Sequence, residues 1–398
     1  MLPKLRFPEF REGEEWIEKT LEEKFEFQDG YAFSSSHFSS SAKRGKQVIR
    51  ITDINNKNKN TDKVYVSDSL IHDLNLDKYF IKKGDLLLSL TGAAGFNFFF
   101  WDSEDALANQ RTMKISPKNE KDVALTRLLE PLIHAKINAF GSGQNNNLSK
   151  EILKQIRTAF PKPDEQQKIA DFLSTIDDLI DAQSQKLDAL EAHKKGLTQQ
   201  LFPSEGETSP KLRFPEFQDA GAWLQKQVKD VCQLQAGKFV SAAEINGNTN
   251  NGLYPCYGAN GLRGYTKSYT HTGKYALIGR QGALCGNVVL ATGQFHATEH
   301  AVVATPKGGV DTDWLFYMLT HSNLNQYATG QAQPGLSVEN LEKVNIQIPK
   351  TENEQQKIAG CLSSIDKLII VQTQKLAALK AHKKGLMQQL FPSTSDIN

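Results

Sequence analysis

Two histidines with the spacing of a zinc site are the first residues that could do chemistry. His296 and His300 lie in the stretch HATEH, which fits the H-x-x-E-H pattern of inverted zinc peptidases. That pattern needs a helix to bring both imidazoles to one face, but Gly293 precedes the stretch and the β-like run AVVAT follows it. The sequence therefore predicts a strand here and no metal site.

Other catalytic patterns are missing. The stretch GANGLRG at 258–264 lacks the G-x-G-x-x-G order, and neither a phosphate-binding G-x-x-x-x-G-K-[ST] loop nor the Asn/Asp-Pro-Pro-Tyr/Phe tetrapeptide of amino-methyltransferases occurs. The cysteines Cys232, Cys256, Cys285 and Cys361 form no C-x-x-C pair, so we expect small buried residues. We expect a non-catalytic chain that binds no cofactor itself.

Polar and basic side chains that can read DNA bases gather in loops of both halves. Arginine can reach guanine, and asparagine or glutamine can reach adenine, through paired hydrogen bonds. In the first half the candidates are Ser36, Lys43, Arg44, Lys46, Arg50, Asn109, Gln110, Arg111 and Gln144. In the second half they are Tyr257, Asn260, Arg263, Tyr265, Lys267, Arg280, Gln281, Gln331 and Gln333. For any single residue, a polar surface rich in turns is the alternative.

Charge is distributed unevenly although the net charge is only +2. Basic residues outnumber acidic ones between residues 42 and 63 and again between 237 and 281. One basic segment in each half could meet a phosphate backbone, and a solvated surface is the alternative.

Two nearly identical segments, 165–202 and 354–391, carry a heptad pattern of apolar residues. The seam positions are Ile169, Leu173, Ile176, Ile180, Gln183, Leu187 and Leu190 in the first copy, and Ile358, Leu362, Ile365, Ile369, Gln372, Leu376 and Leu379 in the second. Such a pattern predicts coiled-coil helices of roughly 55 Å each.

Pairing of the two helices within one chain is favoured over a homodimer, because one chain carries both copies. Gln183 and Gln372 lie at the midpoints of their helices, so an antiparallel pair without stagger would bring the two amides together and fix the register. A hydrated stretch of the seam is an equally open interpretation.

Each half reads as a mixed α/β globule followed by one long helix, which makes the fold class α/β (α+β) with a cyclic internal repeat. We predict globules at 1–160 and 218–350, helices at 164–202 and 353–391, a linker at 203–217 and a tail at 392–398, with Ser149 and Ser337 as helix N-caps. The phrases PKLRFPEF and HKKGL-x-QQLFPS each occur twice. With 39% hydrophobic residues and no apolar run of ~18 residues, we expect a soluble cytoplasmic protein without membrane contact.

The whole chain resembles the specificity subunits of type I restriction-modification systems. The resemblance rests on EQQKIA with its heptads and HKKGL-x-QQLFP in both copies, on GDLLLSLTG in the first globule, and on YPCYGANG and GQAQPGLS in the second. It implies two target-recognition domains, each reading one half of a split DNA target, and family-conserved segments that include 1–25 and both helices.

The resemblance also implies partners and cofactors. Double-stranded DNA, two modification (methyltransferase) subunits and ATP-dependent restriction subunits would bind, and S-adenosylmethionine, ATP and Mg would be held by those subunits. The antiparallel helices would set the spacer between the half-sites. A coiled-coil scaffold whose globules bind protein or glycan is the alternative, and an enzyme acting alone is disfavoured by the missing catalytic motifs.

Overall fold

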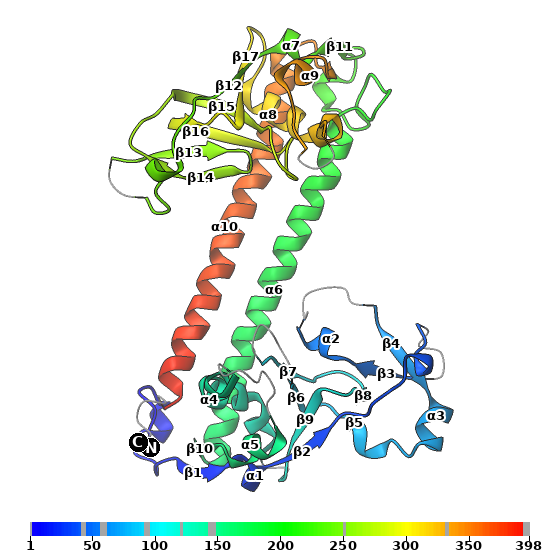
Figure 1. Ribbon diagram of the computed structural model, residues 1–398, viewed down its shortest axis with the longest axis vertical. Helices are drawn as coiled ribbons and strands as arrows, with labels where there is room; N and C mark the ends of the chain where they lie inside the picture. The colour runs from blue at the N-terminus through cyan, green and yellow to red at the C-terminus, as the bar shows by residue number, and fades with distance from the viewer. Residues whose placement is uncertain are drawn as a thin grey trace. The chain divides into compact units, whose positions relative to one another are not determined.

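The chain forms two compact units in the computed structural model (Figure 1), which describes residues 2–40, 45–55, 62–90, 96–119, 122–141, 149–249, 252–330 and 334–392. Unit 1 comprises Met1–Ala182 and Leu376–Asn398, and unit 2 comprises Gln183–Lys375. Each unit therefore contains one mixed α/β domain together with part of each long helix.

The domain of unit 1 contains two four-stranded sheets, ordered β2-β9-β6-β7 and β4-β3-β8-β5, and the antiparallel pair β1-β10. Its strands are β1 Ile17–Thr20, β2 Phe25–Asp29, β3 Gly45–Ile49, β4 Val64–Ser67, β5 Phe80–Ile81, β6 Leu86–Ser89, β7 Phe98–Phe100, β8 Ala106–Ala108, β9 Thr112–Pro117 and β10 Arg157–Phe160. Its short helices are η1 Pro8–Phe10, α1 Leu21–Lys24, η2 Ser35–His37, α2 Ile51–Asn55, α3 Asp68–Asp73, η3 Asp77–Tyr79, α4 Val123–Gly141 and α5 Lys150–Gln155.

The domain of unit 2 contains one six-stranded sheet, ordered β12-β17-β15-β16-β13-β14, and the antiparallel pair β11-β18. Its strands are β11 Leu224–Gln227, β12 Cys232–Ala236, β13 Tyr254–Gly258, β14 Gly261–Thr266, β15 His271–Gly279, β16 Val288–Ala297, β17 Ala301–Pro306 and β18 Asn345–Ile348. Its short helices are η5 Pro215–Phe217, α7 Val228–Val231, η6 Ala242–Glu244, α8 Thr312–His321, η7 Leu324–Tyr327 and α9 Val338–Glu342.

Apolar periodicity explains the cores. In α4 of unit 1, Leu125, Leu128, Leu129 and Ile133 recur at helical spacing and are fully buried against the β2-β9-β6-β7 sheet. In unit 2, α8 buries Trp314 and its apolar neighbours in the same way. The predicted caps are confirmed, because the side chains of Ser149 and Ser337 accept hydrogen bonds from the third backbone N–H that follows each of them.

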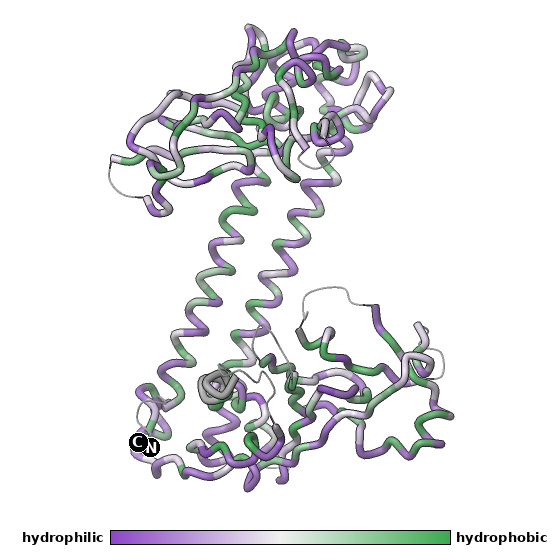
Figure 2. The backbone as a smooth tube through the Cα atoms, viewed as in Figure 1, coloured by the Kyte–Doolittle hydropathy of each residue, from purple (hydrophilic) through white to green (hydrophobic). Residues whose placement is uncertain are grey.

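Two helices of 39 residues each, α6 Pro163–Leu201 and α10 Glu352–Leu390, run antiparallel within each unit. In unit 1, Lys383 Nζ lies 2.5 Å from Asp177 Oδ1, and in unit 2, Lys194 Nζ lies 2.5 Å from Asp366 Oδ1. Green and purple stretches alternate along both helices in Figure 2, as amphipathic helices require. The antiparallel helix pair of the expected fold class is thus present.

The seam residues of the two helices are all buried or partly buried. Those next to the domains are covered best: Ile169 is 1% exposed and Leu362 is fully buried. Near the middle, Gln183 Nε2 donates to Gln372 Oε1 at 2.5 Å. This amide pair opposes sliding of one helix along the other, because a shift would leave the buried amide of Gln183 without its partner.

The repeated phrases meet at one place in each unit. In unit 1, Glu165 of EQQKIA accepts bonds from both Nε and Nη2 of Arg6 of PKLRFPEF at 2.7 Å, and Trp16 Nε1 donates to the same carboxylate at 3.1 Å. The N–H of Leu5 donates to Gln389 O at 2.8 Å, which ties this segment to the end of α10. A common packing site therefore accounts for the repetition of all three phrases.

Unit 2 repeats these contacts with its own copies. Arg213 donates from Nε and Nη2 to Glu354 at 2.7 and 2.8 Å, and Trp223 Nε1 donates to Glu354 at 3.1 Å. The N–H of Leu212 donates to Gln200 O at 2.9 Å. Here the QQLFP end of α6 runs directly into the PKLRFPEF segment, whereas in unit 1 those phrases come from opposite ends of the chain. This is the cyclic order expected from the repeats.

None of the helices that the structure describes combines the length and the hydropathy that a membrane span requires.

Candidate nucleic-acid interface

In unit 1 the turn Asn109–Arg111, between β8 and β9, lies beside the end of β3. The N–H of Asn109 donates to Ile49 O at 3.0 Å, and the N–H of Leu90 donates to Arg111 O at 2.9 Å. Arg50 follows Ile49 directly. We call Arg50, Leu90 and Asn109–Arg111 the turn edge of unit 1. Four of the residues predicted to read DNA, Arg50 and the three of the turn, are brought together there.

The side chains of this edge differ in how free they are. Arg111 is exposed and has a φ of 64°, a left-handed conformation that lifts its side chain out of the regular strand geometry. Arg50 is held instead: its guanidinium lies 3.2 Å from both carboxylate oxygens of Asp53 and donates to Asp62 O at 2.7 Å. Arg111 is therefore better placed for a new contact than Arg50.

The other candidates of unit 1 lie elsewhere. Ser36 is in η2, where its hydroxyl is 2.9 Å from that of Ser34. Lys46 is near the start of β3, opposite Val66, and so at the far end of this strand from Arg50. The candidates Lys43, Arg44 and Gln144 lie outside the described residues.

In unit 2 the turn Thr298–His300, between β16 and β17, lies at the corresponding place. The N–H of Thr298 donates to Tyr257 O at 2.9 Å, at the end of β13. The N–H of Lys238 donates to Ala297 O at 2.8 Å, and that of Arg280 donates to His300 O at 3.0 Å. The turn therefore stands between three chain segments, each of which carries a polar or basic side chain.

Two further loops extend this surface. The β13–β14 turn, with Asn260 and Arg263 exposed, lines a hollow of about 290 Å³ together with His300. Gln281 forms a β-bridge with Gly335, which brings the loop after η7 to the same side. We call Lys238, Asn260–Arg263, Arg280–Gln281 and Thr298–His300 the turn edge of unit 2. Gln331 and Gln333, predicted in the loop after η7, lie outside the described residues.

Groups of opposite charge act on the buried thiol of Cys256 at this edge. Burial raises the pKa of the Cys256 thiol, Arg263 acts on it in the lowering direction, and Glu299 acts in the raising direction. Cys256 is itself completely buried and is a packing residue, as expected.

Three tyrosine and lysine candidates are not part of the exposed edge. Tyr257 packs its ring edge-to-face against Phe295 at 5.7 Å, and burial raises its pKa. Tyr265 and Lys267 lie toward the other end of the β13–β14 hairpin, because Gly258 pairs with Gly261 at the turn and Tyr254 with Thr266 at the open end. These residues are 4 and 6 positions from Gly261, where β14 begins at the turn.

Sequence reasoning did not place Lys238, Glu299 and His300 among the base-reading candidates, although Lys238 belongs to the basic segment 237–281 and the other two belong to the HATEH stretch. The predicted correspondence between ALANQRTMKI and FHATEHAVVA contained the signal, because it places Thr298–His300 opposite Asn109–Arg111. The HATEH stretch is divided between a strand and this turn. His296 lies in β16 and its Nε2 donates to Lys238 O at 3.1 Å. Among the described residues, no group of three or more His, Cys, Asp or Glu side chains is placed to hold a metal ion.

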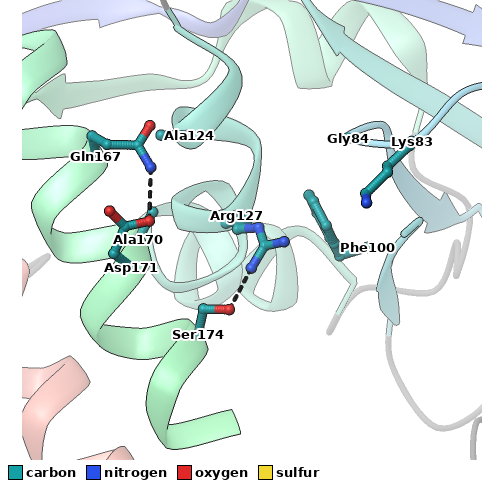
Figure 3. A pocket seen from close by; sticks show the side chains of 9 residues that line it. All are labelled: Lys83, Gly84, Phe100, Ala124, Arg127, Gln167, Ala170, Asp171 and Ser174. Carbon is teal, nitrogen blue, oxygen red and sulfur yellow. Dashed lines mark hydrogen bonds between the residues drawn. The ribbon is translucent and has the colours of Figure 1, made fainter. Parts of the chain in front are cut away.

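A second hollow, of about 350 Å³, lies in unit 1 between α4, the β6–β7 hairpin and α6 (Figure 3). Arg127 is its central side chain. Its Nη1 donates to Ser174 Oγ at 2.6 Å, and its guanidinium lies 4.3 Å from the ring centre of Phe100. The Arg127 contacts join the domain to the long helix, so this hollow is a structural joint.

Comparisons with known proteins agree with this arrangement. The family model described as type I restriction modification DNA specificity domain matches residues 13–192 and again 221–381. A specificity subunit of the Escherichia coli type I restriction enzyme EcoprrI is 47% identical over 145 residues, which cover 36% of this chain and 36% of that protein. The MjaVIII specificity subunit of Methanocaldococcus jannaschii is 23% identical over 351 residues, covering 78% of this chain and 79% of its own.

The alignments with two of the curated relatives span only about a third of those proteins, 36% of the E. coli protein and 32% of one from Haemophilus influenzae. Among solved structures, the crystal structure of the type I restriction-modification S subunit from M. genitalium has a TM-score of 0.68 at 15% identity and covers 99% of this chain and 100% of its own. That likeness establishes the shared fold.

Proposed function

The chain belongs to the family of type I restriction modification DNA specificity domains, and we propose that it is the DNA-recognition subunit of a type I restriction-modification complex. Each unit reads one half of a bipartite target. The observation that carries the proposal is the duplication: the family model matches twice, and each match contains one turn edge.

The chemistry of the two edges supports base reading. The edge of unit 1 offers Asn109, Gln110 and Arg111, whose side chains suit adenine and guanine in the major groove. The edge of unit 2 offers Asn260, Arg263, Arg280 and Gln281. Since the two sets differ, the two half-sites should differ too.

The long helices serve two purposes in this proposal: they set the gap between half-sites, and they dock partner subunits. Large aliphatic side chains off the seam support docking, because Leu179 is 49% exposed, Leu368 50%, Ile370 56% and Val371 55%. Two modification subunits bind there, and restriction subunits join the assembly. One similar solved structure, with a TM-score of 0.53, belongs to work on complex assembly of the type I R-M system.

The chain itself carries no catalytic step in this proposal. S-adenosylmethionine, ATP and Mg are bound by the modification and restriction subunits, and the complex acts in the cytoplasm. The missing catalytic motifs in the sequence support this division of labour.

DNA retention by the modification subunit tests the proposal. With this chain present, retention of double-stranded DNA should be strong at low salt. The affinity should fall by about a thousandfold or more between 50 and 200 mM salt, which is the salt dependence of a protein that makes six or more phosphate contacts. The modification subunit alone is the control. Equal retention without this chain, or retention that is insensitive to salt, would support a protein- or glycan-binding scaffold instead.

A further inference from the structure

The turn Thr298–His300 of unit 2 occupies the position that the base-reading candidates Asn109–Arg111 occupy in unit 1. The first N–H of each turn donates to a carbonyl near the end of the parallel neighbouring strand, at 2.9 Å from Thr298 to Tyr257 O and at 3.0 Å from Asn109 to Ile49 O. The third carbonyl of each turn accepts a bond, at 3.0 Å for His300 O and at 2.9 Å for Arg111 O. The middle residue is Gln110 in unit 1 and Glu299 in unit 2. The same scaffold thus presents an amide in one unit and a carboxylate in the other.

Glu299 lacks a complete set of hydrogen bonds. Its Oε1 lies 3.1 Å from His300 Nε2, whereas its Oε2 is buried and has no hydrogen-bond partner in the described part of the chain. An unsatisfied buried acceptor is costly, so a donor that reaches this carboxylate is favoured. The side chain is 32% exposed, and the broad terminal torsion of glutamate allows either oxygen to turn outward.

The surroundings restrict what that donor can be. Lys238, Arg263 and Arg280 make the edge attractive to phosphates, and a carboxylate among them repels phosphate. In the major groove, the groups of DNA that donate to a carboxylate are the exocyclic amino groups, cytosine N4 or adenine N6. The hollow beside His300 provides space for the edge of a base.

We propose that Glu299, oriented by His300, reads one base pair of the half-site of unit 2 by accepting a hydrogen bond from the exocyclic amino group of cytosine or adenine. This inference rests on the proposed function and adds a specificity-determining residue to it. His300 is a positioning residue, because its Nε2 lies 3.1 Å from Glu299 Oε1.

The test uses Glu299→Gln and Glu299→Ala in the complete complex with the modification subunits. Methylation mapping should show relaxed discrimination, roughly tenfold or more, at one base pair of one half-site and no change in the other half-site. The base pair that relaxes, C·G or A·T, identifies the amino group. Glu339→Gln is the matched control, because Glu339 is an exposed acid on α9 whose partner is Lys343.

Duplexes whose candidate base lacks the amino group give a second readout. The wild-type complex should bind such a duplex about tenfold more weakly than the unmodified duplex. The Glu299→Ala complex should bind both duplexes with the same affinity. An equal loss in both, or an unaltered half-site in both Glu299 variants, overturns the inference. In that case a wild-type complex that still reads a bipartite target leaves the proposed function intact, whereas a wild-type complex without sequence-specific methylation refutes the proposed function itself. Methylation that still depends on the half-site of unit 1 shows that each variant is folded.

Discussion

Replacing residues 218–350 with the corresponding domain of another family member should change one half of the methylated target and leave the other half unchanged. The segment contains every strand of unit 2, from Leu224 of β11 to Ile348 of β18. Unit 1 has its own hydrophobic core, in which Leu125 and Ile133 are fully buried. Because neither the sheets nor the turn edge of unit 1 include any residue of the exchanged segment, its half-site should survive the exchange.

The exchange should preserve the tryptophan at position 223, because Trp223 Nε1 donates to Glu354 of α10. Methylation sequencing of cells that carry the hybrid provides the measurement. A second hybrid, in which Trp223 is also replaced by alanine, is the control for this contact with α10. It should be less stable than the first hybrid but should methylate the same DNA motif. Loss or alteration of both half-sites in a folded hybrid would refute the independence of the two units.

Glu354→Gln should destabilise the protein by about 3–5 kcal/mol, since it leaves the guanidinium of Arg213 buried without its counter-charge. The side chains of Arg213 and Glu354 are only 10% and 1% exposed. At about 2–4 °C per kcal/mol for a unit of this size, the melting temperature should fall by roughly 10 °C. Calorimetry of the full chain measures this loss.

Glu165→Gln should have a similar effect through Arg6, because unit 1 repeats the contact with exposures of 9% and 2%. Glu339→Gln removes the same charge from an exposed pair and should change stability by less than about 1 kcal/mol. If Glu354→Gln melted at the same temperature as Glu339→Gln, the buried pair would not be the joint between domain and helix.

The helical part of the fold follows from the sequence because its information is local. Heptad spacing predicts both long helices, the presence of two copies favours an intramolecular pair, and Ser149 and Ser337 mark helix starts. The helices and their caps depend on residues within one or two turns of each other, which a periodic pattern records directly.

The candidate interface could be predicted only in part, because it depends on long-range strand pairing. Asn260 and Arg263 come together with His300 only through the parallel pairing of β13 with the end of β16. Arg50 was predicted to contact DNA, and the structure shows that Asp53 and Asp62 already hold its guanidinium. No local pattern records these partners, and the set of residues that contact DNA stays a prediction.

Long-read methylation sequencing of host DNA, with and without this chain, tests the central claim most directly. The two-unit arrangement predicts one bipartite motif, with two different half-sites and a gap of constant length, that is methylated when the chain is present and unmethylated when it is deleted. A motif that persists after deletion, or a contiguous motif without a gap, would contradict the claim that the two units of this chain specify the DNA target.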